Sequence, residues 1–131
     1  MRETFFDYDT ENDSLFIYKK SKIKGSMDIG DIIVDISIDG KVIGIEMLNA
    51  SEMLKNLGLK NPKEILNSIK GVSIRAIYKT DSIIVYYSII SKAKEVSSSI
   101  AVPVQVNYHP TSWMASGNFM IQNYAVKGLF T

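Results

Sequence analysis

Acidic and hydroxyl side chains between residues 35 and 46 have the spacing of a calcium-binding loop. Asp35, Ser37, Asp39, Gly40 and Glu46 fall on the ligand positions and the glycine position of an EF-hand loop. Such a loop needs a helix on each side, whereas residues 32–38 alternate between apolar and polar side chains, as a β-strand does. Because a strand and a turn explain the same residues, we interpret the match as coincidental and expect no calcium, other metal or cofactor.

Asp35 and Glu46 also share one face of a hairpin if the chain turns back at Asp39 and Gly40. Two neighbouring carboxylates could carry out acid–base chemistry or hold a divalent ion. Charged side chains on the water-facing side of a half-buried sheet are, however, ordinary. We therefore name Asp35, Glu46 and the nearby Asn49 as candidate contact residues, and we name no residue as catalytic.

The single histidine, His109, lies beside Pro110 in a loop. Ser112 could pair with it as a nucleophile with its base, but neither a strand–turn–helix elbow nor a glycine-rich oxyanion loop accompanies them. A loop histidine next to proline is usually a surface group. We keep His109 and Trp113 as candidate contact residues only.

The densest basic run contains Lys20, Lys22 and Lys24, which alternate onto one face. A row of lysines could follow a phosphate backbone. Lysines along an edge strand also prevent edge-to-edge pairing of sheets, and this explanation needs no ligand. We favour the edge explanation and keep the three lysines as candidate contact residues.

The composition limits the classes of function. The chain has 15 basic and 14 acidic residues, and its only arginines are Arg2 and Arg75, so nucleic-acid binding is unexpected. It has no cysteine, which excludes thiol chemistry and fits a reducing compartment. No signal segment opens it, and no apolar run approaches the ~20 residues of a membrane span. We expect a single cytoplasmic domain over residues 1–131 without membrane contact.

The elements that must position these residues begin with a hairpin over residues 32–47. Asp39 and Gly40 predict a two-residue type I′ turn. This register places apolar residues opposite one another on a single face: Ile36 with Ile43, Val34 with Ile45, and Ile32 with Met47.

The hairpin and the segment before it resemble a known family. The resemblance is carried by Tyr8-Asp9, by Asp13-Ser14-Leu15-Phe16-Ile17, and by Gly44-Ile45-Glu46 followed two residues later by Asn49-Ala50-Ser51. Over about residues 5–54, these residues resemble domain-of-unknown-function family 2283. The family has no established activity, so the resemblance implies no site.

Alternation and turn residues predict further strands over residues 4–8, 14–20, 72–78, 82–90, 100–106 and 118–126. Capping residues predict short helices over residues 51–57 and 62–70. Pro103 predicts that its strand is an edge or carries a bulge. We expect an α+β fold, with a largely antiparallel, twisted β-sheet of about seven or eight strands and two short helices packed on one face.

An offset of 68 residues places the apolar alternation of residues 32–38 on that of residues 100–106. This agreement suggests two similar β-rich halves. It predicts an internal repeat of residues 5–50 and 73–126 joined by a helical connector over residues 51–70.

The segment of residues 82–90 carries an apolar stripe on each face, so both faces need cover. Leaving one stripe in water would forfeit on the order of 6–10 kcal/mol. We therefore predict a homo-oligomer, most simply a dimer, with one stripe as its interface: Ile83, Val85, Tyr87 and Ile89.

Three function classes remain open. The first is a small, soluble, non-catalytic interaction protein, acting as a homo-oligomer or as the stable partner of another protein. The second is a binding module for a small ligand or single-stranded nucleic acid, using the lysine-rich strand or the Asp35/Glu46 face. The third is a hydrolase or lyase using Asp35, Glu46 or His109. The sequence identifies neither the partner nor the strand order.

Overall fold

The computed structural model describes residues 3–104, so His109, Trp113 and the predicted strand over residues 118–126 lie outside the described residues. Within residues 3–104 the chain forms eight strands and two short helices. In chain order these are β1 (Thr4–Asp9), β2 (Ser14–Lys19), β3 (Ile23–Ile29), β4 (Ile32–Ser37), β5 (Val42–Met47), α1 (Ala50–Asn56), α2 (Pro62–Leu66), β6 (Ile69–Tyr78), β7 (Ser82–Ser91) and β8 (Glu95–Pro103).

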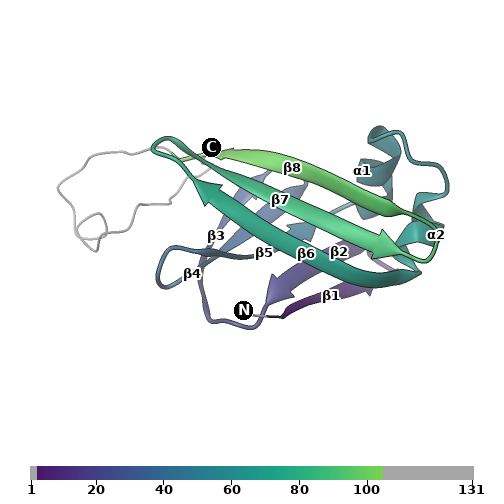
Figure 1. Ribbon diagram of the computed structural model, residues 1–131, viewed down its shortest axis with the longest axis horizontal. Coiled ribbons are helices and arrows are strands. Elements are labelled where there is room, and N and C mark those ends of the chain that lie inside the picture. Colours follow the sequence, from purple (N-terminus) through teal and green to yellow (C-terminus); the bar gives the residue numbers. More distant parts are fainter. Residues whose placement is uncertain (1–2, 105–131) are drawn as a thin grey trace.

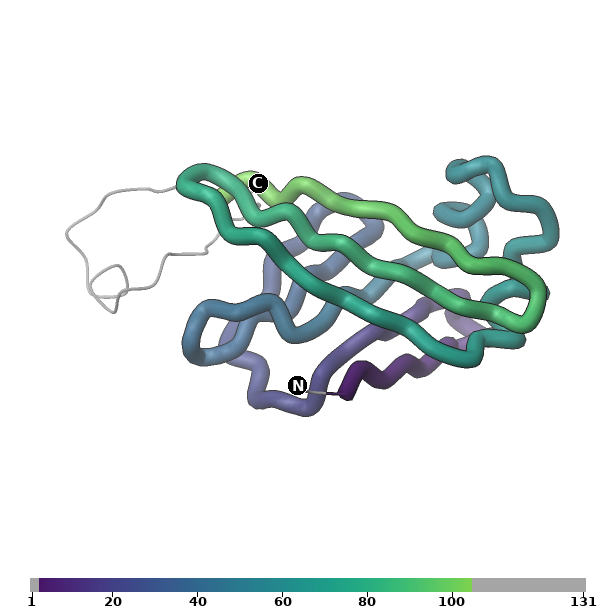
Figure 2. Tube along the Cα trace, viewed as in Figure 1, coloured from purple at the N-terminus to yellow at the C-terminus, as the bar shows by residue number. Residues whose placement is uncertain are grey.

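The strands form two antiparallel sheets stacked face to face (Figure 1). The first has the order β1-β2-β5-β4-β3 and the second the order β6-β7-β8. Figure 2 shows the second sheet crossing over the first, with the helical segment at one end. The predicted α+β, largely antiparallel class is confirmed. The expected single sheet covered by helices is wrong, because the two sheets cover each other's apolar faces instead.

The core lies between the two sheets and is closed at one end by the helices. Side chains alternate between the two faces along each strand, and most core members are the residues that point inward. They include Leu15, Ile17, Val34, Ile45 and Met47 from the first sheet, Ile74, Ile83, Val85, Tyr87 and Ile89 from the second, and Leu54, Ile65 and Leu66 from the helical segment.

The stripe proposed as an oligomer interface belongs to this core. Ile83, Val85, Tyr87 and Ile89 are each no more than 4% exposed within the single chain. The assignment of these four residues to a subunit interface is therefore corrected, because the chain's own core buries them. Whether the protein forms a dimer stays a prediction.

The hairpin of β4 and β5 forms as predicted, but its turn differs. Gly40 N donates to Ser37 O at 2.9 Å, and Ser37 N donates to Lys41 O at 2.8 Å. Gly40 has a φ of 80°, whereas Asp39 is not among the residues with positive φ. A type I′ turn needs positive φ at both central residues, so that prediction is wrong. The loop contains three residues, 38–40.

A bulge then shifts the register beyond the turn. Ile36 pairs with Val42 and Asp35 pairs with Gly44, which leaves Ile43 as the extra residue. The predicted Val34–Ile45 and Ile32–Met47 pairs are confirmed. The Ile36–Ile43 pair is wrong, because Val42 takes the inward position and Ile43 moves to the opposite face.

The strand pairing does not support the internal repeat. Strand β2 pairs with β1 and β5, whereas β7, at the matching position of the proposed repeat, pairs with β6 and β8. Among the strands of residues 3–104, β8 is an edge strand, so the edge prediction for Pro103 is confirmed for this part of the chain. Strand β3, which the sequence did not predict as an element, is another edge and carries Lys24.

Neither α1, with seven residues, nor α2, with five, is long and apolar enough to cross a membrane, and no other helix occurs within residues 3–104.

Candidate functional site

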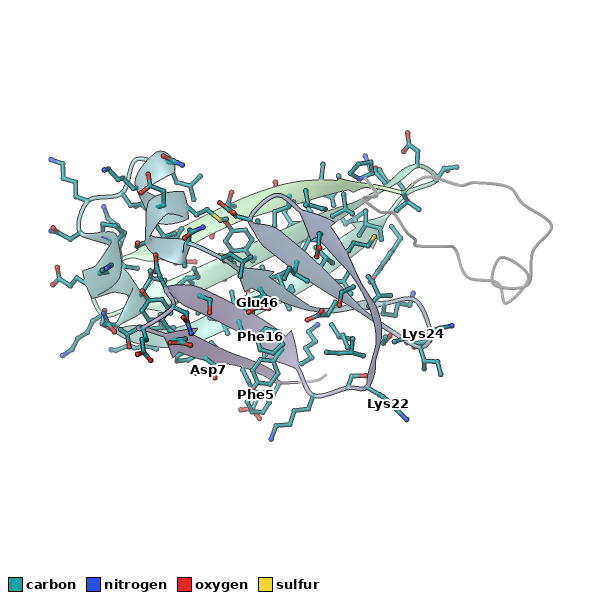
Figure 3. All side chains as sticks on the ribbon, turned by 180° about the vertical axis from the view of Figure 1, so that it is seen from behind. Phe5, Asp7, Phe16, Lys22, Lys24 and Glu46 are labelled. Carbon is teal, nitrogen blue, oxygen red and sulfur yellow. The ribbon has the colours of Figure 1, made fainter. Side chains whose placement is uncertain are left out.

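The side of the five-stranded sheet that faces away from the core carries both aromatic and charged residues. We call this side the outer face. Figure 3 shows Phe5, Phe16 and Glu46 along neighbouring strands of this side, with Lys22 and Lys24 beyond them. On β2 and β5 the outer face is built by strand alternation, since the sequence neighbours of Phe16 and Glu46 are buried in the core: Leu15, Ile17, Ile45 and Met47.

Three rings on β1 and β2 form an aromatic ridge. Phe5 pairs directly with Tyr18 across the strands, and their ring centroids are 5.7 Å apart. The Phe16 and Tyr18 centroids are 4.6 Å apart, and each pair has an interplanar angle of 24°. Lys20 Nζ lies 4.7 Å from the centroid of the Phe5 ring. Each aromatic pair stabilises a protein by about 0.5–1.5 kcal/mol beyond the burial of its rings. We therefore expect the rings of the ridge to keep these positions.

Gly44 makes room beside this ridge. It pairs with Tyr18 of β2 on one side and with Asp35 of β4 on the other, so it lies between them on the outer face. A Cβ atom at Gly44 would lie 3.3 Å from Cε1 of Phe16 and 3.2 Å from the carbonyl oxygen of Ile17. The glycine therefore lets the Phe16 ring approach the backbone of β5.

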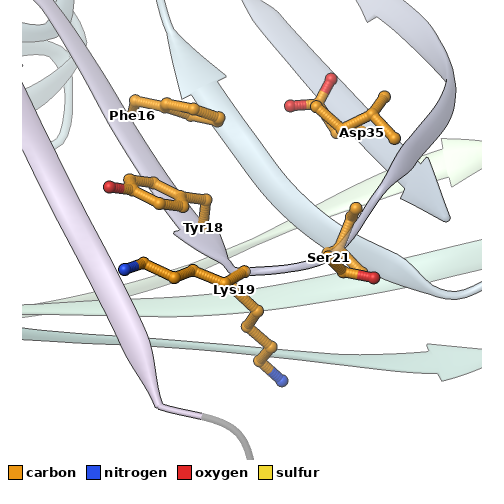
Figure 4. Close-up of a pocket in the computed structure, with 8 residues that line it drawn as sticks. Phe16, Tyr18, Lys19, Ser21 and Asp35 are labelled. Atoms are coloured by element: carbon orange, nitrogen blue, oxygen red, sulfur yellow. The ribbon is translucent and has the colours of Figure 1, made fainter.

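The outer face contains a cavity of about 310 Å³, which we call the outer pocket (Figure 4). Phe16 and Tyr18 of the aromatic ridge bound one side and Asp35 the other. Its lining residues are Phe16, Tyr18, Lys19, Lys20, Ser21, Ile23, Asp35 and Ile43. Ile43 reaches the pocket because the bulge in β5 turns it away from the core.

Asp35 is only 7% exposed although it lies on the outer face. Ser26 Oγ donates a hydrogen bond to its Oδ1 at 2.6 Å, while no hydrogen bond from the described residues reaches Oδ2. Burial raises the pKa of Asp35, the Ser26 hydrogen bond opposes this rise, and the negative charge of Glu46 adds to it. No described lysine forms an ion pair with this carboxylate. Its negative charge is therefore poorly compensated.

The other predicted contact residues divide into two groups. Glu46 is half-buried on the outer face, close enough for its charge to act on Asp35, and Lys20 lines the outer pocket. Lys22 and Lys24 are exposed and line no part of that pocket. Asn49 lies at the N-cap position of α1 and makes no side-chain cap hydrogen bond. The structure thus brings Asp35, Glu46 and Lys20 to one face.

The cap of α1 comes from a residue that the sequence analysis did not single out. Asp13, in the β1–β2 turn, accepts hydrogen bonds from Ser51 N at 3.1 and 3.2 Å and from Ser51 Oγ at 2.6 Å. Tyr8 donates its hydroxyl proton to the same carboxylate at 2.6 Å. Partial burial favours a higher pKa for Asp13, but these hydrogen bonds outweigh it and hold the pKa below its usual range. The only sequence signal was that Tyr8, Asp13 and Ser51 all belong to the family resemblance.

The residues that match the EF-hand spacing lie in the hairpin of β4 and β5. Asp35 and Glu46 lie on two paired strands and not in a loop between helices. Within residues 3–104, no three histidine, aspartate or glutamate side chains gather as they would around a metal ion.

Comparisons with known proteins found curated relatives that align with part of the chain. An uncharacterized protein of Methanocaldococcus jannaschii is 47% identical over 60 residues, which is 39% of this chain and 52% of that protein. A Methanosarcina mazei protein with the provisional name hypoxanthine phosphoribosyltransferase is 44% identical over 68 residues, 51% of each chain. The chain thus spans about half the length of these curated relatives. No solved structure matches.

The family comparison covers the part of the chain that builds the site. Every residue that lines the outer pocket lies between residues 6 and 51. These same residues, 6–51, match the family described as "Protein of unknown function (DUF2283)", which confirms the resemblance read from the sequence.

Proposed function

We propose that this protein is a non-catalytic binding module that holds a small molecule in the outer pocket. The observation that carries the proposal is the Asp35 carboxylate, which is 7% exposed, lines the pocket and has one oxygen without a hydrogen bond from the described residues. Burying a charge without a full set of partners costs stability. A ligand that pairs with the carboxylate would recover part of this cost.

The outer face supports a small ligand better than a nucleic acid. Nucleic-acid binding on a sheet relies on exposed ring faces and positive charge along the backbone path. In the aromatic ridge the rings stack on one another, which covers much of their faces. The same side of the sheet carries four carboxylates, those of Asp7, Asp28, Asp35 and Glu46, which would repel phosphates.

The pocket also supports binding better than acid–base catalysis. Acid–base catalysis usually needs two titratable groups, both within hydrogen-bond distance of the reacting atoms. Glu46 shares the face with Asp35 but lines no part of the outer pocket. We propose a cytoplasmic location for this binding module, which the absence of cysteine from the sequence supports.

A pocket-filling substitution tests the proposal. A library of small metabolites is screened against the full chain by thermal shift, and each hit is repeated with Ser21→Trp, which places an indole at the pocket wall. We expect hits whose shift disappears in Ser21→Trp and persists in the control Ser99→Trp, which changes an exposed residue of β8. Hits that ignore Ser21→Trp, or a library without hits, would contradict the proposal.

A second candidate function is self-association through the outward side of the three-stranded sheet. Ile77 is 41% exposed and Ile90 is 43% exposed on this side, and Arg75 lies 4.4 Å from the ring centroid of Tyr86 there. Ile77 pairs with Ile84 and Gly71 pairs with Ile90, so the two exposed isoleucines lie toward opposite ends of this side, with the half-buried Tyr86 between them. Apolar side chains spread along the outward side of a sheet favour a protein contact, either with a second copy or with another protein. Light scattering tests the homodimer: Ile90→Lys should convert a dimer to a monomer, while Ile38→Lys, at a 70% exposed turn position, should not. A wild-type monomer would contradict self-association.

A further inference from the structure

We infer that the ligand of the outer pocket is a small primary amine, whose ammonium group binds Oδ2 of Asp35 and whose apolar part contacts Phe16 and Ile43. This inference rests on the proposed function, because it names the chemical class of the molecule that the pocket would hold.

The Asp35 carboxylate lacks a partner for one of its two oxygens. Oδ1 accepts a hydrogen bond from Ser26 Oγ at 2.6 Å, whereas no donor from residues 3–104 reaches Oδ2. The side chain is nevertheless only 7% exposed, and Figure 4 shows its carboxylate turned toward the Phe16 side of the pocket. An ionised carboxylate only accepts hydrogen bonds, so the group that completes its bonding must be a donor.

The charge of Asp35 also lacks a counterion within residues 3–104. No described lysine or arginine forms an ion pair with it, and the charge of Glu46, which acts on it, is negative as well. Because the carboxylate is buried beside apolar side chains, water screens its charge less than at an open surface. A neutral donor would complete the hydrogen bonding but leave the charge uncompensated. An ammonium group supplies both a donor and a positive charge.

The two lysines that line the pocket do not compensate Asp35. Lys20 Nζ lies 4.7 Å from the ring centroid of Phe5, which belongs to β1. Strands β2 and β5 separate β1 from β4, the strand that carries Asp35. Lys19 directly follows Tyr18 in β2, so strand alternation directs its side chain to the opposite side of the sheet. The position beside Asp35 is therefore left for a positive charge on the ligand.

The other walls of the pocket favour a compact apolar body on this ligand. Phe16, Tyr18, Ile23 and Ile43 line the pocket together with Asp35. At about 310 Å³ the outer pocket is at the lower end of the ~300–1,000 Å³ that ligand sites occupy. This space suits an amine with a short alkyl chain or a single ring and excludes a long peptide segment from lying fully inside.

The test compares amines with alcohols of the same shape by NMR titration of the full chain at neutral pH. The pairs are butylamine with butanol, cyclohexylamine with cyclohexanol, and benzylamine with benzyl alcohol. We expect at least one amine to shift the Ile43 and Gly44 amides and to bind about tenfold more tightly than its alcohol, or more, because only the amine forms a charge-assisted hydrogen bond. Asp35→Asn should remove this preference. Asp28→Asn, which neutralises an exposed carboxylate of β3, should change it less than about twofold.

The outcomes separate the inference from the proposed function. The inference is overturned, and the binding module stands, if alcohols bind as tightly as amines, if the preference for amines survives Asp35→Asn, or if other molecules bind in the pocket while no amine does. If neither an amine nor a library molecule shifts the pocket amides, both are overturned. The comparison of amines with alcohols on the wild-type chain decides the inference even where a substitution disturbs folding.

Discussion

Asp35→Asn should make the protein more stable at neutral pH. The wild-type carboxylate is 7% exposed and receives one hydrogen bond, from Ser26 Oγ at 2.6 Å. Asparagine keeps an oxygen that can accept this hydrogen bond and nearly the same side-chain volume, while it removes the negative charge. The substitution therefore removes the cost of burying the charge without making a cavity.

The size of the effect follows from the contacts of the carboxylate. A buried polar group without its partners costs about 1–3 kcal/mol. Asp35 keeps one partner and borders an open pocket that admits water, so we expect a gain near ~1 kcal/mol. For a domain of about 100 residues, this corresponds to a rise in melting temperature of roughly 4 °C.

The pH dependence of stability provides a second test of whether Asp35→Asn stabilises the protein. The pKa of Asp35 is raised in the folded state by burial, with the Glu46 charge adding to the rise. Below the ordinary value of 3.8, the carboxyl is protonated in both states and carries no penalty. As the pH rises from there through the folded pKa, ionisation becomes more costly in the folded state, and wild-type stability is lost. The advantage of Asp35→Asn should thus appear across this window and stay constant above it.

Urea unfolding of both proteins at several pH values measures this difference directly. Asp28→Asn is the matched control, because Asp28 is exposed on the same side of the sheet, and it should change stability by less than about 0.5 kcal/mol. An Asp35→Asn protein that is less stable than wild type at neutral pH would show that the carboxylate is well compensated, which would refute this reasoning.

Four further predictions concern the scaffold. Asp13→Ala should lower stability by about 0.5–2 kcal/mol because it removes the acceptor at the start of α1; since the folded pKa of Asp13 is depressed, urea unfolding should show this contribution above pH ~4 and its loss as the pH falls. Gly44→Val should lower the melting temperature and reduce binding in the outer pocket, because even a Cβ atom would lie 3.3 Å from the Phe16 ring; unchanged stability would contradict the close approach. Ile45→Ala should cost about 2–5 kcal/mol in urea, since the side chain is fully buried. Calcium should leave the melting temperature unchanged, whereas a true site at 100 times its dissociation constant would add about 2.7 kcal/mol.

The sequence predicted the features that depend on alternation within one strand. The inward positions of Val34 and Ile45 follow from the period of two, and the edge position of β8 follows from the missing N–H of Pro103. The division into two sheets could not be predicted in this way. An inward apolar stripe has the same pattern whether a helix or a second sheet covers it, so the stripe on β7 was assigned to a second subunit.

The candidate site was predicted only in part, because its geometry depends on strand order and on one bulge. Asp35 was expected to point away from the core, which it does, but alternation along β4 gave no sign that this carboxylate would be only 7% exposed. Asp39-Gly40 is compatible with loops of two or three residues. The sequence therefore could not show that Val42 would face the core and Ile43 the outer face. Asp13 and Ser51 are 38 residues apart in the sequence, so patterns of neighbouring residues could not predict their hydrogen bond.

Mapping a bound small molecule on the full chain by amide chemical shifts tests the central claim most directly. We predict that a molecule found by the thermal-shift screen moves the amides of Ser21, Ile43 and Gly44 most, and leaves those of Ile84 and Ile90 on the outward side of the three-stranded sheet unchanged. Shifts that centre on Ile84 and Ile90, with none around Gly44, would contradict the claim that the outer pocket is the binding site.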